Sequence, residues 1–222
     1  MRIIISEKFI LGSNTQERFE NHIKNTLGIS PQYLDEGSDG IVYSINQTTA
    51  IKFSNTPPTV EKSLIGKSIP GIISYYKSGQ IDIPEEIYSD REFQFLNRAN
   101  AIKNSQKLPH MRIYWVTMER LSAPPLRILE AIDGYFDQFE AQHPSSYHQK
   151  LFNFIIEADG KEKRDFLSYT QEMPQVVHRY IQNLYTIGDS LKANGIPYDD
   201  FRFDQLGVDS NGDLKLFDLT ST

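Results

Sequence analysis

The chain has 222 residues and contains no cysteine, which excludes disulfides, thiolate metal sites and cysteine nucleophiles. Its net charge of −6, without any cluster of lysine and arginine, argues against nucleic acid as the main partner. Hydrophobic residues make up 39% of the chain and aromatic residues 12%. This composition excludes a disordered chain and predicts one large domain or two small lobes.

Neither a membrane span nor a signal peptide is expected from the apolar pattern. No apolar run approaches the roughly 18 residues of a membrane-crossing helix. The apolar run at the N-terminus, Ile3–Ile5, is too short for the core of a signal peptide. We therefore expect a cytoplasmic protein without a membrane partner. A secreted effector whose export signal lacks an apolar core remains compatible with this pattern.

The first half of the chain has the patterns of a small antiparallel sheet. Apolar residues at helical spacing predict an opening helix over residues 16–27. Short β-rich runs separated by polar turns then predict a meander. The expected strands span residues 32–36, 41–46, 50–53, 71–78 and 111–118. Helices are expected over residues 59–68, with Thr59 as the cap, and over 85–103.

From Pro124 onward the apolar spacing changes to that of helices. Helices are expected over residues 126–139, with a stripe of Leu129, Ile132, Phe136 and Phe139, and over 147–157 and 174–194. Strands at 206–208 and 214–217 then flank an Asn-Gly turn. A β-rich half followed by a helical half predicts the α+β class. The predicted division is 1–121 and 122–222.

Two short motifs in the first half have chemical meaning together. Gly37-Ser38-Asp39-Gly40 forms a hairpin turn, and Val42 lies two residues beyond it. Glycine allows a backbone to approach phosphates closely, although such a turn alone is ordinary. The next strand carries Ala50-Ile51-Lys52. Glu61 follows on the next expected helix, and Glu92 lies on a later one.

The end of the chain is its most specific part. The long helix over 174–194 leads to Asp200, with Arg202 two residues later and Gln205 five residues later. The predicted hairpin follows at once and ends at Asp218. Asp199 and Asp204 are also five residues apart, so they define an alternative frame for the spacing of Asp200 and Gln205. We prefer the first frame because it places Leu206 and Val208 on one face of the strand.

These segments, in this order, resemble those of the protein kinase-like phosphotransferases, the eukaryotic-type Ser/Thr kinase fold. The resemblance implies two lobes, with a small antiparallel β N-lobe and a truncated, mainly helical C-lobe. It implies ATP and Mg²⁺ as cofactors and a protein hydroxyl as acceptor. The strand over 113–121 would lead into the hinge that receives adenine, with Met118 behind the adenine pocket. The resemblance also implies that Lys52 pairs with a helical glutamate, for which Glu61 is the best candidate and Glu92 the second.

The resemblance assigns a role to each matching residue. Asp200 would orient the acceptor hydroxyl and take its proton, while Arg202 and Lys52 would neutralise phosphoryl charge. Asp218 and Gln205 would hold Mg²⁺. The nucleotide would be bound by residues of the hairpin, the strands, the helix and the hinge: Gly37, Ser38, Gly40, Val42, Lys52, Glu61, Met118, Glu119 and Leu121.

The chain also departs from the family pattern. Tyr198 and Asp199 replace the usual histidine and arginine, and Gln205 replaces asparagine. Leu219 and Thr220 follow Asp218, and the resemblance is to a minimal form that is expected to lack the activation segment. In this respect it is similar to minimal kinases among bacterial effectors.

Three functions therefore stay open. They are a minimal protein kinase, a pseudokinase that binds a protein partner, and an enzyme that transfers AMP. The insert over 122–173 either covers the lower core or binds a partner. Asp209–Asp213 superficially suggests a Ca²⁺ loop, although an Asn-Gly hairpin turn explains it better. The five histidines show no metal-ligand spacing.

Overall fold

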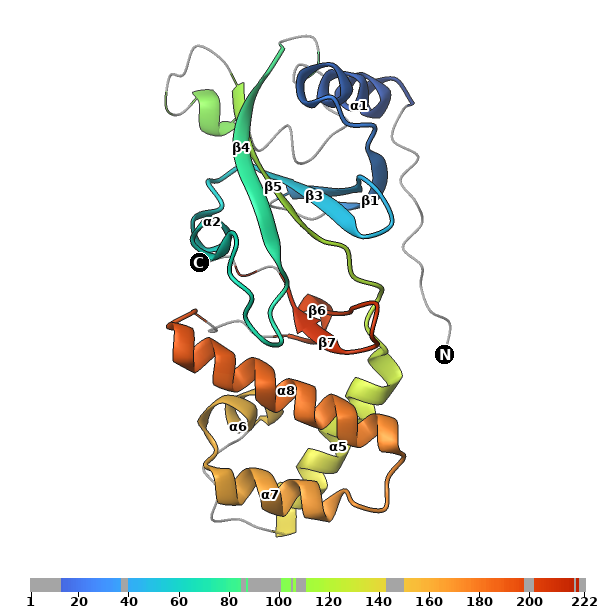
Figure 1. Cartoon of the computed structure of the whole chain (residues 1–222), viewed down its shortest axis with the longest axis vertical. Helices are drawn as coiled ribbons and strands as arrows, with labels where there is room; N and C mark the ends of the chain where they lie inside the picture. The colour runs from blue at the N-terminus through green and yellow to red at the C-terminus, as the bar shows by residue number, and fades with distance from the viewer. Residues whose placement is uncertain are drawn as a thin grey trace. The chain divides into compact units, whose positions relative to one another are not determined.

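The computed structural model describes residues 13–36, 40–84, 87, 101–104, 106, 111–142, 150–197, 202–217 and 219. The chain forms two compact units, residues 1–62 with 75–119 and residues 63–74 with 120–222 (Figure 1). Residues 63–74 group with the second unit although they precede a strand of the first. Strands and helices are both abundant, so the α+β class predicted from the sequence is confirmed.

The first unit is built on a five-stranded antiparallel sheet with the order β1-β2-β3-β5-β4. Its strands are β1 (Gln32–Glu36), β2 (Gly40–Ser44), β3 (Thr49–Ser54), β4 (Tyr75–Ile83) and β5 (Met111–Glu119). Helix α1 (Ser13–Leu27) packs on one face of the sheet. Phe19 of α1 meets Phe53 of β3 edge to face, with ring centroids 5.5 Å apart. This apolar contact fixes α1 to the sheet.

Two elements of the first half have other bounds in the structure than the sequence predicts. Helix α2 (Thr59–Leu64) stops before Gly66, whose φ of +76° is left-handed and ends the helix. The Thr59 hydroxyl donates to the Pro57 carbonyl at 3.4 Å and does not cap the helix. Strand β4 begins at Tyr75, because Gly71 takes a turn conformation with φ of +72°. Most of the predicted helix over 85–103 lies outside the described residues.

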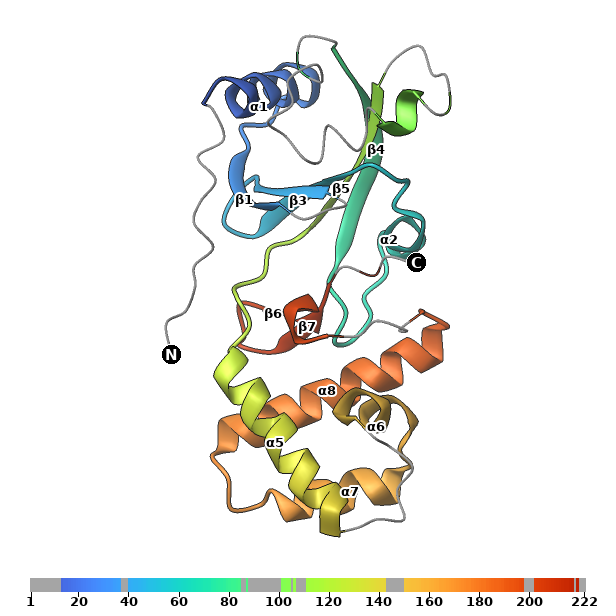
Figure 2. The same ribbon diagram turned by 180° about the vertical axis from the view of Figure 1, so that it is seen from behind.

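The second unit contains four helices in its described part, and Figure 2 shows them from behind. They are α5 (Leu126–Gln142), α6 (Leu151–Glu157), α7 (Gly160–Tyr169) and α8 (Gln175–Asn194). The predicted stripe of α5 is confirmed, because all four of its residues are at most 4% exposed. Phe136 and Phe139 pack against Phe154 of α6 and Phe166 of α7. The predicted helix over 147–157 begins at Leu151 among the described residues.

A short β-hairpin completes the second unit. Its strands β6 (Leu206–Val208) and β7 (Leu214–Leu216) lie where the sequence predicts them, and the 3₁₀ turn η1 (Phe203–Gln205) precedes β6. The Ile73 amide donates to the Leu216 carbonyl at 3.0 Å, and the Leu216 amide donates to the Gly71 carbonyl at 2.8 Å. Residues 71–73 thus extend the hairpin. Among the described helices, none has both the length and the apolar character needed to cross a bilayer.

Candidate functional site

The first unit places three of the predicted nucleotide-binding residues on one face of its sheet. Val42 of β2 lies opposite Lys52 of β3, and Lys52 lies opposite Val116 of β5. Residues that face each other across antiparallel strands share a face, and so do residues two apart along a strand. Met118, two residues after Val116, therefore joins Val42 and Lys52. Helix α1 packs on the opposite face, through the side chain of Phe53.

Glu61 is a buried carboxylate in this unit. It lies in α2, the first helix after the strand that carries Lys52, and the residue is 3% exposed. Carboxylates are almost never buried to this extent unless a partner compensates for lost hydration. Lys52 is half-buried. Glu92, the second candidate partner, lies outside the described residues.

The glycine hairpin has a structural requirement of its own. A Cβ added to Gly40 would lie 2.3 Å from the carbonyl oxygen of Phe53, so a side chain at this position would collide with β3. Close packing of β2 on β3 therefore explains Gly40 without reference to a ligand. Gly37 and Ser38, the other predicted phosphate-binding residues of the turn, lie outside the described residues.

The predicted hinge residues divide between the two units. Met118, which is 7% exposed, and the half-buried Glu119 end β5 in the first unit. Leu121 belongs to the second unit, where it packs on Gly207 of β6. The Ser122 amide donates to the Val208 carbonyl at 2.9 Å, and the Val208 amide donates to the Ser122 carbonyl at 3.0 Å. These bonds pair the segment after β5 with β6.

The turn before β6 carries Arg202 and Gln205. The Arg202 amide donates to the side-chain oxygen of Gln205 at 3.1 Å, and the Gln205 amide donates to the Arg202 carbonyl at 3.1 Å. The Arg202 guanidinium lies 3.6 Å from the Asp204 carboxylate in an exposed ion pair. The Phe217 amide donates to the Gln205 carbonyl at 2.9 Å. Gln205 is thereby bound to the residue that precedes Asp218 in the sequence.

The turn between β6 and β7 is organised by Asp209, whose side chain is 6% exposed. Its carboxylate accepts hydrogen bonds from the amides of Asn211 and Asp213 at 2.8 and 3.0 Å and lies 3.5 Å from the Lys215 ammonium. Burial raises the pKa of Asp209, but the two amides and Lys215 outweigh it, and the pKa lies below its ordinary value. The carboxylate is therefore occupied by its own turn, as the Asn-Gly hairpin interpretation predicts.

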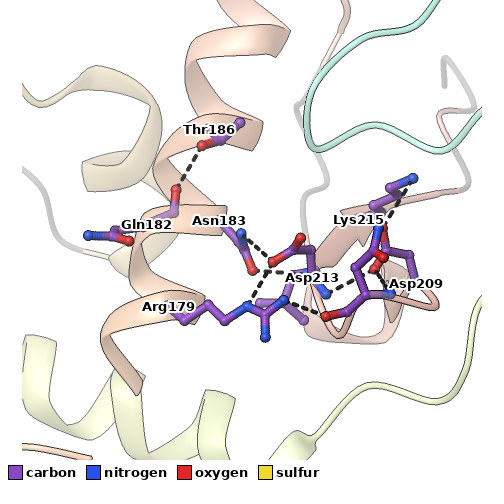
Figure 3. A network of polar contacts seen from close by, with 9 residues as sticks. Arg179, Gln182, Asn183, Thr186, Asp209, Asp213 and Lys215 are labelled. Atoms are coloured by element: carbon purple, nitrogen blue, oxygen red, sulfur yellow. Dashed lines mark hydrogen bonds and ion pairs between the residues drawn. The ribbon is translucent and has the colours of Figure 1, made fainter. Parts of the chain in front are cut away.

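Helix α8 clamps this hairpin through two polar side chains one helical turn apart (Figure 3). The Arg179 guanidinium donates to the Asp213 carboxylate at 2.8 Å and also to the Asn211 carbonyl. The hydrogen bond to Asp213 raises the pKa of Arg179. The side-chain oxygen of Asn183 accepts from the Leu214 amide at 3.0 Å. The start of β7 is thus fixed to α8.

We expect Asn183→Ala to lower the free energy of unfolding by about 1–3 kcal/mol. Leu214 is 1% exposed, so loss of the Asn183 oxygen leaves its amide without this acceptor. Thr186→Ala is the matched control on the same helix, because Thr186 is exposed and its hydroxyl donates only within α8. It should change stability by less than about 0.5 kcal/mol. Equal effects of the two substitutions in denaturant unfolding would contradict the assigned role of Asn183.

Sequence reasoning did not identify Arg179 and Asn183. A signal was available, because they are polar residues four apart on a helix whose other face is apolar. Helix α7 was also missed, although Asp159 and Glu162 have the spacing of a capping box, and the structure contains that box. Asp200 and Asp218 lie outside the described residues. Within the described ranges, no group of three or more histidines and carboxylates is arranged to hold a metal ion.

Comparison with protein-family models gave no match, and a search of curated proteins gave no significant match.

Proposed function

We propose that the chain is a minimal kinase-like phosphotransferase that moves the γ-phosphoryl group of ATP, with Mg²⁺, to a protein hydroxyl. In this proposal the two units are the lobes of a protein kinase-like fold. The observation that carries the proposal is the buried Glu61 on the first helix after the strand that carries Lys52. Protein kinases pair a lysine of the third strand with a glutamate of the following helix.

The order of the remaining elements supports the same proposal. The hairpin with Gly40 precedes β3, and Val42, Lys52 and Met118 share one face of the sheet. In the second unit, a long helix precedes the hairpin whose second strand leads to Asp218. The hydrogen bond from Phe217 to Gln205 joins one proposed Mg²⁺-binding residue to the residue that precedes the other in the sequence.

Each residue has a role that follows from its charge. Lys52, oriented by Glu61, would neutralise phosphate charge, and Arg202 would neutralise charge on the transferred group. Asp200 would hold the acceptor hydroxyl in place and accept its proton. Asp218 and the side-chain oxygen of Gln205 would bind Mg²⁺, the cofactor that neutralises charge on the phosphates. That Gln205 oxygen also accepts a hydrogen bond from Arg202. An amide oxygen has two lone pairs, so one would remain for a metal.

One observation favours a second candidate, a pseudokinase that uses the fold to bind a protein partner. Gln205 replaces asparagine in the family pattern, and its oxygen has a local role in closing the turn at Arg202. The side chain is thus explained without a metal. Mg²⁺ requires near-ideal octahedral ligand geometry, which a longer side chain with a second hydrogen-bonding role meets less readily.

The test is intact-mass spectrometry after incubation with Mg·ATP, with and without a cell lysate as acceptor. We expect a phosphoryl adduct on this chain or on a lysate protein, and its loss in Asp200→Asn and in Asp218→Ala. Removal of a catalytic base or metal ligand typically lowers rates by about 10²-fold or more. Asp204→Asn is the matched control, because Asp204 is exposed and belongs to the alternative frame. The Asp204→Asn variant should still give the phosphoryl adduct.

Each other result selects a different function. An adenylyl adduct would show AMP transfer. A folded parent chain that gives no adduct with any acceptor would contradict the phosphotransferase and favour the pseudokinase. Loss of the adduct in Asp204→Asn, with retention in Asp200→Asn, would shift the site to the frame of Asp199 and Asp204.

A further inference from the structure

Helix α6 packs closely against α8 in the second unit. A Cβ added to Gly188 of α8 would lie 2.7 Å from the carbonyl oxygen of Ile155 in α6, so the two backbones approach as closely as glycine allows. Leu151, Phe154 and Ile155 of α6 are each at most 1% exposed. Tightly packed elements of this kind transmit displacement instead of absorbing it.

Phe152 of the same helix contacts the turn that precedes β6. Its ring lies edge to face on the ring of Phe203, with centroids 4.8 Å apart and an angle of 64° between the ring planes. Both side chains are half-buried. Edge-to-face pairs favour a defined relative orientation of the two rings. The contact therefore fixes the first residue of η1 relative to α6.

The turn of residues 202–205 gains from such support because its own bonds are weak. Hydrogen bonds of short 3₁₀ segments have poor geometry. An exposed ion pair such as Arg202–Asp204 contributes little to the stability of the turn. The bond from Phe217 to Gln205 holds the far end of the turn. At the start of the turn, Phe152 packs on Phe203, which lies between Arg202 and Gln205 in the sequence.

We propose that Phe152 is a positioning residue that acts through Phe203 on the turn of residues 202–205. In this role α6 holds Arg202 and Gln205 in the orientation that phosphoryl transfer requires, which rests on the function proposed above. The helical insert over 122–173 would then support the reaction directly, in addition to covering the core. A partner that displaces α6 would change the rate through this contact.

Amide hydrogen exchange tests the contact without any need for activity. In Phe152→Ala we expect exchange at Gln205 and Leu206, whose amides donate to Arg202 and Phe203, to accelerate about tenfold by local opening. Exchange at Leu214, in the part of the hairpin clamped by α8, should not change. Phe152→Tyr keeps the ring and should behave as the parent chain. Asn153→Ala, on the exposed side of α6, is the control for general effects on the helix.

Kinetics supply the second readout. In Phe152→Ala we expect kcat to fall about tenfold with little change in KM for ATP, and Phe152→Tyr should restore it. Unchanged exchange at Gln205 and Leu206, or equal acceleration at Leu214, would overturn the proposal. If the parent chain transfers no phosphate, the proposed function fails, and exchange alone decides whether Phe152 holds the turn. If Phe152→Ala does not fold, Phe152→Leu is judged by the same criteria.

Discussion

Lys52→Met is expected to lower phosphoryl transfer by about 10²- to 10³-fold, which is typical for loss of one charge that stabilises a transition state. It should also lower the free energy of unfolding by about 1–3 kcal/mol. The reason is Glu61, a residue that is 3% exposed, whose carboxylate would keep its desolvation cost after losing the proposed partner. Transfer assays and denaturant unfolding of the same variant measure both effects.

The double variant Lys52→Met with Glu61→Gln separates the two effects. A neutral amide at position 61 removes the buried charge, so stability should return toward that of the parent chain while transfer stays low. Lys77→Met, at an exposed position of β4, is the control and should change stability by less than about 0.5 kcal/mol. Additive losses of stability in the double variant would show that Lys52 and Glu61 do not form a pair.

Gly71→Ala is expected to destabilise the second unit by about 2–5 kcal/mol. The φ of +72° costs an L-residue about 1–2 kcal/mol. In addition, the new Cβ would lie 2.7 Å from the Ile187 side chain and 3.1 Å from the Ile187 backbone of α8. Overpacking against such a neighbour adds about 1–3 kcal/mol.

Gly66→Ala is the matched control for Gly71→Ala. Its φ of +76° is nearly the same, but a Cβ there meets nothing within 4 Å. Gly66→Ala should therefore lower the free energy of unfolding only by the cost of the positive φ, about 1–2 kcal/mol. Far-ultraviolet circular dichroism follows the helices, and most helical residues in the described part of the chain belong to the second unit. Fluorescence of the single tryptophan, Trp115, reports on the first unit. Equal losses for both glycine substitutions would contradict close packing of Gly71 on α8.

Sequence patterns predicted the elements that carry strong periodicity or clear turn residues. The long helix over 174–194 and the strands around Asn211-Gly212 were found to within a few residues, because apolar spacing and Asn-Gly turns act locally. The start of β4 was placed too early, since Ile72 and Ile73 look like strand residues. They are buried and pair with β7 instead, which local spacing does not reveal.

The candidate site was predictable only in part, for a physical reason. The Lys52 face of the sheet follows from alternation along strands, once the strands are located. The clamp by Arg179 and Asn183 and the contact of Phe152 with Phe203 depend on which helix face meets the hairpin. That pairing is set by tertiary packing between segments far apart in sequence. The roles of Asp200 and Asp218 stay predictions.

The grouping of residues 63–74 with the second unit has a consequence for dissecting the protein. The chain passes between the units after residues 62, 74 and 119, so no single cut yields two self-contained pieces. A fragment that ends near residue 121 would retain Ile72 and Ile73, which are 2% and 4% exposed in the whole chain, without β7 to cover them. An uncovered apolar segment with free backbone groups promotes association between chains. Isolated units should therefore be prepared with residues 63–74 shortened, or the chain should be kept whole.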